Sequence, residues 1–89
     1  MRTVDQYLNY LEEKGFKFQD DAIGFIYFGK HSTNASDVLT TTAIELTLKV
    51  QKSFDGSFYM SLLETLKTNQ IRTRSGAIKF AKQRDFFAV

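Results

Sequence analysis

The 89-residue sequence contains no cysteine, no proline and no tryptophan, and it has a single histidine. Without cysteine the chain can form no disulfide, has no thiolate nucleophile and cannot build a cysteine-ligated zinc or iron–sulfur site. One histidine in a chain without cysteine also argues against a transition-metal site. The five glycines never form a Gly-rich phosphate-binding loop. We therefore expect no cofactor.

The sequence also lacks a long apolar run. No stretch approaches the roughly 18 apolar residues of a membrane span, and the polar residues that follow Arg2 are unlike the apolar centre of a signal peptide. The hydrophobic content of 43% and the charged content of 25% are those of an ordinary globular protein. We expect one domain spanning residues 1–89, located in the cytoplasm and without a membrane partner.

Charge is distributed unevenly along the chain. Residues 65–89 contain six basic residues and one acidic residue, a net charge of +5. Residues 1–64 contain six basic and nine acidic residues, a net charge of −3. This asymmetry predicts a basic surface in the C-terminal part, suited to phosphates or to an acidic partner.

A helix is predicted near each end of the chain. Thr3 and Gln6 have the spacing of a capping box, and apolar residues follow at helical spacing. Gly15 predicts the end of this first helix, after which Phe16 and Phe18 are expected to turn into the core. The second helix is expected to begin at Thr73 or Ser75. Four residues group on its apolar side: Ala77, Ile78, Phe80 and Ala81.

Between these helices the sequence predicts strands. Residues 22–28 form a run rich in β-branched and aromatic side chains, followed by a polar loop at residues 29–37. Residues 44–51 alternate between apolar and polar, which places Leu46 on a buried face of a strand and Thr47 on the exposed face.

The dipeptide Asp55-Gly56 predicts a hairpin turn, and residues 58–63 are expected to return along the preceding strand. Residues 62–70 fit a strand or a helix, and we favour the strand. The predicted fold is an α+β domain, with an N-terminal helix, a three- or four-stranded mostly antiparallel sheet and a C-terminal helix, in the order α-β-β-β-(β)-α.

This order resembles that of a double-stranded RNA-binding domain, and Thr73-Arg74 is similar to the basic start of the second helix in that family. The resemblance implies RNA binding by that helix. However, the span from Asp55-Gly56 to the helix is longer than in the family, and Ser75 stands where a second lysine is expected. The chain is therefore not assigned to that family.

Two groups of residues contain the residue types of catalytic or metal sites, but their positions in the sequence argue against such a site. His31, Ser32 and Asp37 are the residue types of a hydrolase triad, yet they lie in one short predicted loop, whereas triad partners normally come from separate rigid elements. The acidic pairs at residues 12–13 and 20–21 could hold Mg²⁺, but adjacent acids at a helix end and a turn are usually only solvated. We expect no enzyme, no catalytic residue and no metal site.

The best candidate site precedes the second helix. A helix N-terminus offers free amides and a partial positive charge, and arginines with a hydroxyl beside it suit a phosphate or a carboxylate. The alternative is that these basic residues only solvate the helix. The candidate nucleic-acid or anion-binding residues are Arg72, Arg74, Ser75, Lys79 and Lys82.

The predicted function is that of a small, non-enzymatic binding domain. We favour nucleic-acid binding through phosphate contacts. The alternative is a protein-interaction module, such as an inhibitor or adaptor of phage or mobile-element type, and a homodimer formed through an uncovered strand edge is compatible with both. The candidate interface residues are aromatic: Tyr10, Tyr27, Tyr59, Phe86 and Phe87.

Overall fold

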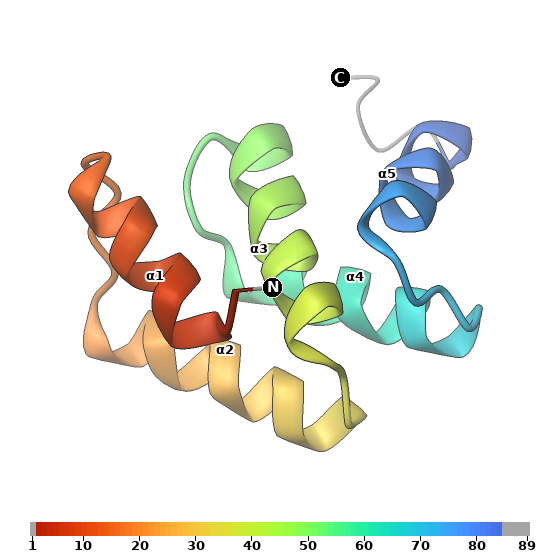
Figure 1. Ribbon diagram of the computed structural model, residues 1–89, viewed down its shortest axis with the longest axis horizontal. Helices are drawn as coiled ribbons and strands as arrows, with labels where there is room; N and C mark the ends of the chain where they lie inside the picture. Colours follow the sequence, from red (N-terminus) through yellow and green to blue (C-terminus); the bar gives the residue numbers. More distant parts are fainter. Residues whose placement is uncertain (1, 85–89) are drawn as a thin grey trace.

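The computed structural model describes residues 2–84, and these residues form a helical protein (Figure 1). No strand is present within this range, so the predicted α+β fold with a sheet is wrong. The homodimer through a sheet edge loses its basis for the same reason. The five helices are α1 (Val4–Glu13), α2 (Asp20–Thr33), α3 (Asp37–Gln51), α4 (Gly56–Thr68) and α5 (Arg74–Gln83).

Helix α3 lies at the centre of the arrangement. It packs against each of the other four helices, while α2 and α4 also pack against each other. In Figure 1, α1 and α5 lie on opposite sides of α3, and α2 and α4 run across its lower part. The end of α1 and the start of α2 lie on the side of the molecule away from α5. The fold thus keeps the acidic segments 12–13 and 20–21 apart from the basic C-terminal helix.

One apolar core joins the helices. It contains Val4 and Leu11 from α1, Ile26 from α2, and the side chains of α3, α4 and α5 that face them. Burial of such side chains is the main favourable contribution to folding, at about 25 cal/mol for each Å² of apolar surface removed from water. The buried residues of the three later helices include Leu39, Ala43, Ile44, Leu46, Tyr59, Leu62, Leu63, Leu66, Ala77 and Ala81.

The first helix confirms the sequence prediction. The Thr3 hydroxyl accepts from the Gln6 amide at 3.2 Å, and the Gln6 side chain accepts from the Thr3 amide at 3.0 Å, which completes the capping box. At the other end Gly15 has a φ of +100°. The Phe16 amide donates to the Leu11 carbonyl at 3.0 Å, as expected for a helix end with glycine in the left-handed region.

Residues 22–28, predicted to be a strand, belong to α2. The acids Asp20 and Asp21 form the first turn of the helix, where negative charge is favourable. The helix continues to Thr33, so the predicted loop at 29–37 is also wrong over most of its length. Ile26 and Gly29 are its buried residues, and their spacing of three follows the helical period.

Residues 44–51 lie in α3, and the predicted alternation of faces is wrong. Thr47 is fully buried, as is Leu46. Two of its threonines fit a buried helix because their hydroxyls bond to the preceding turn: Thr47 donates to the Ala43 carbonyl and Thr42 to the Val38 carbonyl, both at 2.7 Å. Their polar groups are therefore satisfied without solvent.

The Asp55-Gly56 pair begins a helix instead of turning a hairpin. The Asp55 carboxylate accepts from the Phe58 amide at 3.0 Å and caps α4. Residues 62–68 continue α4, so the preference for a strand there is wrong. The second predicted helix is confirmed as α5, where the Thr73 hydroxyl accepts from the Gly76 amide at 3.0 Å.

Tyr59 and Tyr27 both have buried hydroxyl groups, and comparing them tests the side-chain hydrogen bond between α4 and α2. The Tyr59 hydroxyl donates to the Ile26 carbonyl at 2.7 Å, whereas the buried Tyr27 hydroxyl has no hydrogen-bond partner among residues 2–84. We expect Tyr59→Phe to lower the free energy of unfolding by about 1 kcal/mol, and Tyr27→Phe to leave it unchanged or raise it. Urea denaturation followed by circular dichroism measures both. Equal losses would show that the Tyr27 hydroxyl also makes a stabilising hydrogen bond.

Candidate functional site

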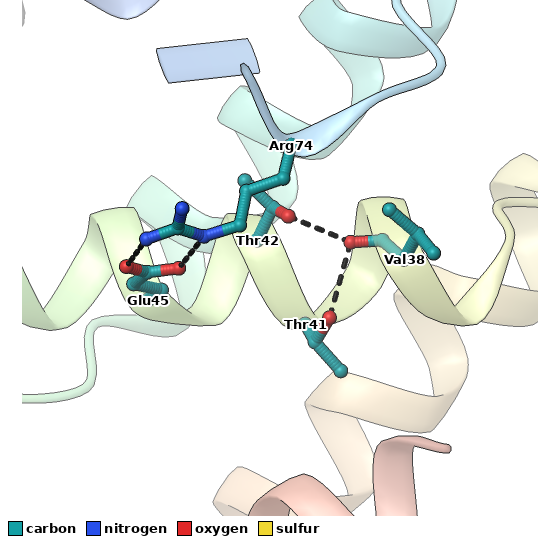
Figure 2. Close-up of polar contacts among 5 residues, drawn as sticks. All are labelled: Val38, Thr41, Thr42, Glu45 and Arg74. Atoms are coloured by element: carbon teal, nitrogen blue, oxygen red, sulfur yellow. Dashed lines mark hydrogen bonds and ion pairs between the residues drawn. The ribbon is translucent and has the colours of Figure 1, made fainter. Parts of the chain in front are cut away.

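The start of α5 positions Arg74 differently from the sequence prediction. Its guanidinium reaches α3 and forms a two-point ion pair with Glu45 (Figure 2), with Nε donating to Oε1 at 2.9 Å and Nη2 donating to Oε2 at 2.6 Å. The Glu45 carboxylate raises the pKa of Arg74, through this hydrogen bond first and its charge second. Arg74 is thus engaged by an internal carboxylate at the place where a phosphate was expected.

The other predicted anion-binding residues are exposed. Arg72 lies in the segment before α5, Ser75 lies in its first turn, and Lys79 and Lys82 lie one turn apart on its surface. Helix α5 contains no acidic residue. Three of the predicted cations, Arg72, Lys79 and Lys82, are therefore exposed, while the Arg74 guanidinium is paired with Glu45.

The predicted interface aromatics have different environments. Tyr10 is 37% exposed, Tyr27 is half-buried, and Tyr59 has no exposed surface. Tyr59 is therefore inaccessible to a partner in this fold. Phe86 and Phe87 lie outside the described residues.

A groove of about 540 Å³ lies between α1 and α3, next to the start of α5. Residues from both helices form its walls, and Phe16 from the segment after α1 contributes a further aromatic side chain. Its volume is within the common range of binding pockets, about 300 to 1,000 Å³. The lining residues are Arg2, Tyr7, Tyr10, Leu11, Phe16, Val38, Thr41, Thr42, Glu45, Leu48 and Arg74.

Ring stacking and a cation–π contact hold the tyrosine side chains of the groove in place. The Tyr7 and Tyr10 rings stack with their centroids 6.2 Å apart. The Arg2 guanidinium carbon lies 4.1 Å from the Tyr10 centroid, a distance typical of a cation–π contact. Phe16, predicted to lie in the core, is instead 42% exposed. Two large aromatic side chains of the groove are therefore accessible from solvent.

The polar part of the groove is mostly satisfied by internal contacts. The Thr41 and Thr42 hydroxyls both donate to the Val38 carbonyl (Figure 2), at 3.1 and 2.7 Å. Burial raises the pKa of Tyr7 to about 12, and the negative charge of Glu45 contributes to this rise. Tyr7 therefore stays neutral near physiological pH.

The residues considered for catalysis lie on two helices, α2 and α3. His31 and Ser32 lie in the last turn of α2, where the Ser32 hydroxyl donates to the Gly29 carbonyl at 3.4 Å. Asp37 begins α3, and its carboxylate accepts from the Val4 amide at 3.2 Å, which links α1 to α3. His31 and Asp37 line the same small pocket of about 140 Å³, which Ser32 does not line. Within residues 2–84, no group of three or more acidic, His or Cys side chains could hold a metal ion.

None of the helices in the described part of the chain is long and apolar enough to cross a membrane.

Sequence reasoning missed three residues that shape the groove. No function was predicted for Arg2, and Phe16 was expected in the core. Glu45 belongs to the alternating residues 44–51 and was expected on the exposed face of a strand. Glu45 and Arg74 are 29 positions apart, so no local pattern could pair them. The one local signal was Gly15, because a helix that ends there turns the chain sharply and determines where Phe16 points.

The sequence matches a known protein family. No curated protein and no solved structure matches the sequence. A family model described as a family of unknown function, DUF6123, matches residues 1–87. Because this match extends over almost the whole chain, the protein belongs to the DUF6123 family.

Proposed function

We propose that this protein is a non-enzymatic protein-binding domain and that the groove between α1 and α3 is its binding surface. The observation that carries the proposal is the pair of accessible aromatic side chains, Tyr10 and Phe16, beside the aliphatic groove residues Leu11, Val38 and Leu48. Tyrosine, phenylalanine and arginine are enriched in the contact surfaces of protein complexes. The cytoplasmic location expected from the sequence is kept as part of the proposal.

The stacking around Tyr10 supports this proposal. Tyr10 contacts the Tyr7 ring and the Arg2 guanidinium, and the Lys14 ammonium nitrogen lies 5.5 Å from its centroid. A side chain held in this way loses little conformational freedom when a partner binds, so more of the contact energy appears as affinity.

Affinity capture from a lysate of the source cells tests the proposal. The double variant Tyr10→Ala, Phe16→Ala is expected to lose a partner that the parent recovers, because truncation of aromatic anchors costs roughly 2 kcal/mol or more each at interface centres. The matched control is Phe28→Ala, since Phe28 is 64% exposed on α2 and lies outside the groove. Recovery unaffected by the double variant, or lost only in the control, would contradict the proposal.

Nucleic-acid binding through α5 is the second candidate. A separate observation favours it: α5 has no acidic residue, it exposes Lys79 and Lys82, and Arg72 precedes it. We rank it second because Arg74 is engaged with Glu45, which leaves fewer cations for phosphates than the sequence indicated.

A charge reversal tests this second candidate. The variant Lys79→Glu, Lys82→Glu is expected to weaken duplex binding, and contacts from three cations would give the parent a slope of log K against log salt near −2.7, at roughly −0.9 per phosphate. The control Lys17→Glu, Lys52→Glu makes the same charge change at exposed positions outside α5. An identical slope for the α5 variant and the parent, or no binding by the parent at low salt, would remove nucleic acid from consideration.

A further inference from the structure

Arg2 is a cation of the groove without an anionic partner. Among residues 2–84 it has no hydrogen bond or ion pair, and its contacts are with the rings of Tyr10 and Tyr7, whose centroids lie 4.1 and 6.0 Å from the guanidinium carbon. A guanidinium that stacks on an aromatic ring contacts the ring with its flat face, so the N–H donors at its edge stay available for hydrogen bonds. Two parallel N–H donors at that edge match the two oxygens of a carboxylate. Arg2 is thus placed to receive a carboxylate from outside.

The charged residues that line the groove leave a net positive charge. Arg2, Arg74 and Glu45 are the charged residues that line it. Glu45 is paired with Arg74, so no carboxylate among residues 2–84 that lines the groove compensates the charge of Arg2, and the Lys14 ammonium beside Tyr10 adds to it. A partner with negative charge would therefore be attracted to this end of the groove.

The rest of the groove is apolar and offers few free donors. Tyr10, Phe16, Leu11 and Leu48 contribute apolar surface, and the hydroxyls of the lining threonines are bonded to their own helix. A ligand with charged groups and no apolar groups would leave this apolar surface of the groove exposed to water. The groove instead fits a segment with apolar side chains and at least one carboxylate, as amphipathic segments present when they bind in grooves.

We propose that the groove binds an acidic amphipathic segment of a partner protein, in which a carboxylate pairs with Arg2 and apolar side chains pack on Tyr10, Phe16 and Leu48. This inference rests on the proposed protein-binding function and specifies the chemistry of the partner. A protein segment fits better than a single-stranded nucleic acid, because the aliphatic groove residues Leu11, Val38 and Leu48 have no counterpart in a sugar–phosphate chain.

Selection from a displayed library of random peptides on the full chain tests the inference. We expect the selected peptides to combine Asp or Glu with Leu, Phe or Trp. Their affinity for Arg2→Met should be lower by about tenfold or more, since a two-point carboxylate pair is lost. The control is Lys79→Met, which removes the same charge from the surface of α5 and should bind as the parent does. Circular dichroism checks that both variants are folded.

Four other results would overturn the inference. Selected peptides that lack acids and bind Arg2→Met as well as the parent, but lose binding to Tyr10→Ala, would reject the acidic partner and keep the groove as a protein-binding site. Peptides whose binding is unaffected by Tyr10→Ala, or the absence of any selected peptide, would count against the groove itself. A single-stranded oligonucleotide that binds the parent and loses affinity with Arg2→Met would replace the protein partner with nucleic acid.

Discussion

Replacement of Thr47 by glutamate is expected to unfold most of the protein at room temperature. Thr47 has no exposed surface, and its hydroxyl is bonded to the Ala43 carbonyl within α3. A carboxylate at this position would have to be buried without a partner, which costs several kcal/mol, or would force α3 away from its neighbours. The total stability of a chain of this size is roughly 4 to 13 kcal/mol, at about 0.05 to 0.15 kcal/mol per residue. The substitution thus removes much of it.

The control for this experiment is Gln51→Glu. It makes the same charge change near the end of the same helix, at an exposed position, where an acid costs at most about 1 kcal/mol through the helix dipole. Urea denaturation followed by circular dichroism compares the two variants. If Thr47→Glu were as stable as Gln51→Glu, residue 47 would face solvent, as the alternation of residues 44–51 had predicted.

Replacement of Gly29 by alanine is expected to destabilise the contact between α2 and α4. A Cβ atom at Gly29 would lie 2.7 Å from the Met60 sulfur and 2.8 Å from the Tyr59 ring carbon Cε2. Met60 has a flexible side chain and can move, but Tyr59 is fully buried and its hydroxyl is bonded to the Ile26 carbonyl. Overpacking of this kind costs about 1 to 3 kcal/mol, measured by the shift of the urea midpoint.

Gly24→Ala is the matched control, because Gly24 lies in the same helix and a Cβ atom there would meet nothing within 4 Å. Alanine is favoured over glycine inside a helix by about 1 kcal/mol, so this variant should be more stable than the parent. The difference between the two variants isolates the cost of packing. Stabilisation by both substitutions would show that α2 and α4 are not in close contact at Gly29.

The two end helices could be predicted because their signals are local. In α1, the capping box of Thr3 and Gln6 and the glycine at position 15 lie within a few residues of the backbone groups that they satisfy. In α5, Thr73 likewise caps an amide three residues away. Such contacts need no distant partner, so the sequence specifies them directly.

The three central helices were predicted as strands, with a helix kept as the alternative for residues 62–70, because their local signals fit two structures. Asp55-Gly56 suits a hairpin turn, but Asp is also a favoured helix cap, and the structure uses the second property. Helices α2, α3 and α4 are followed by Asn34, Lys52 and Gln70 at positive φ. Because glycine is the usual residue at such helix ends, Lys52 and Gln70 gave no sign that a helix stops there.

The sequence of α3 fits both the two-residue period of a strand and the 3.6-residue period of a helix, and tertiary contacts decided between them. Its sequence contains the alternation of residues 44–51, and also the helical spacing of Leu39, Ala43 and Leu46. Because α3 packs against all four other helices, it is buried on several sides and lacks the single polar face that would have revealed its period. Burial by neighbours from elsewhere in the chain therefore selected the helix over the strand preferred by its β-branched residues.

The sequence alone determined the capped helices at the two ends and the acidic-to-basic asymmetry along the chain, because local hydrogen bonds and formal charges need no knowledge of distant residues. Only the tertiary structure decided which charges are free. It paired Arg74 with Glu45 and placed Arg2 over the Tyr10 ring, without an anionic partner in the described part of the chain. It also left Phe16 exposed beside them. The pair of Arg74 and Glu45 joins α5 to α3, whose relative position depends on how all five helices share one core.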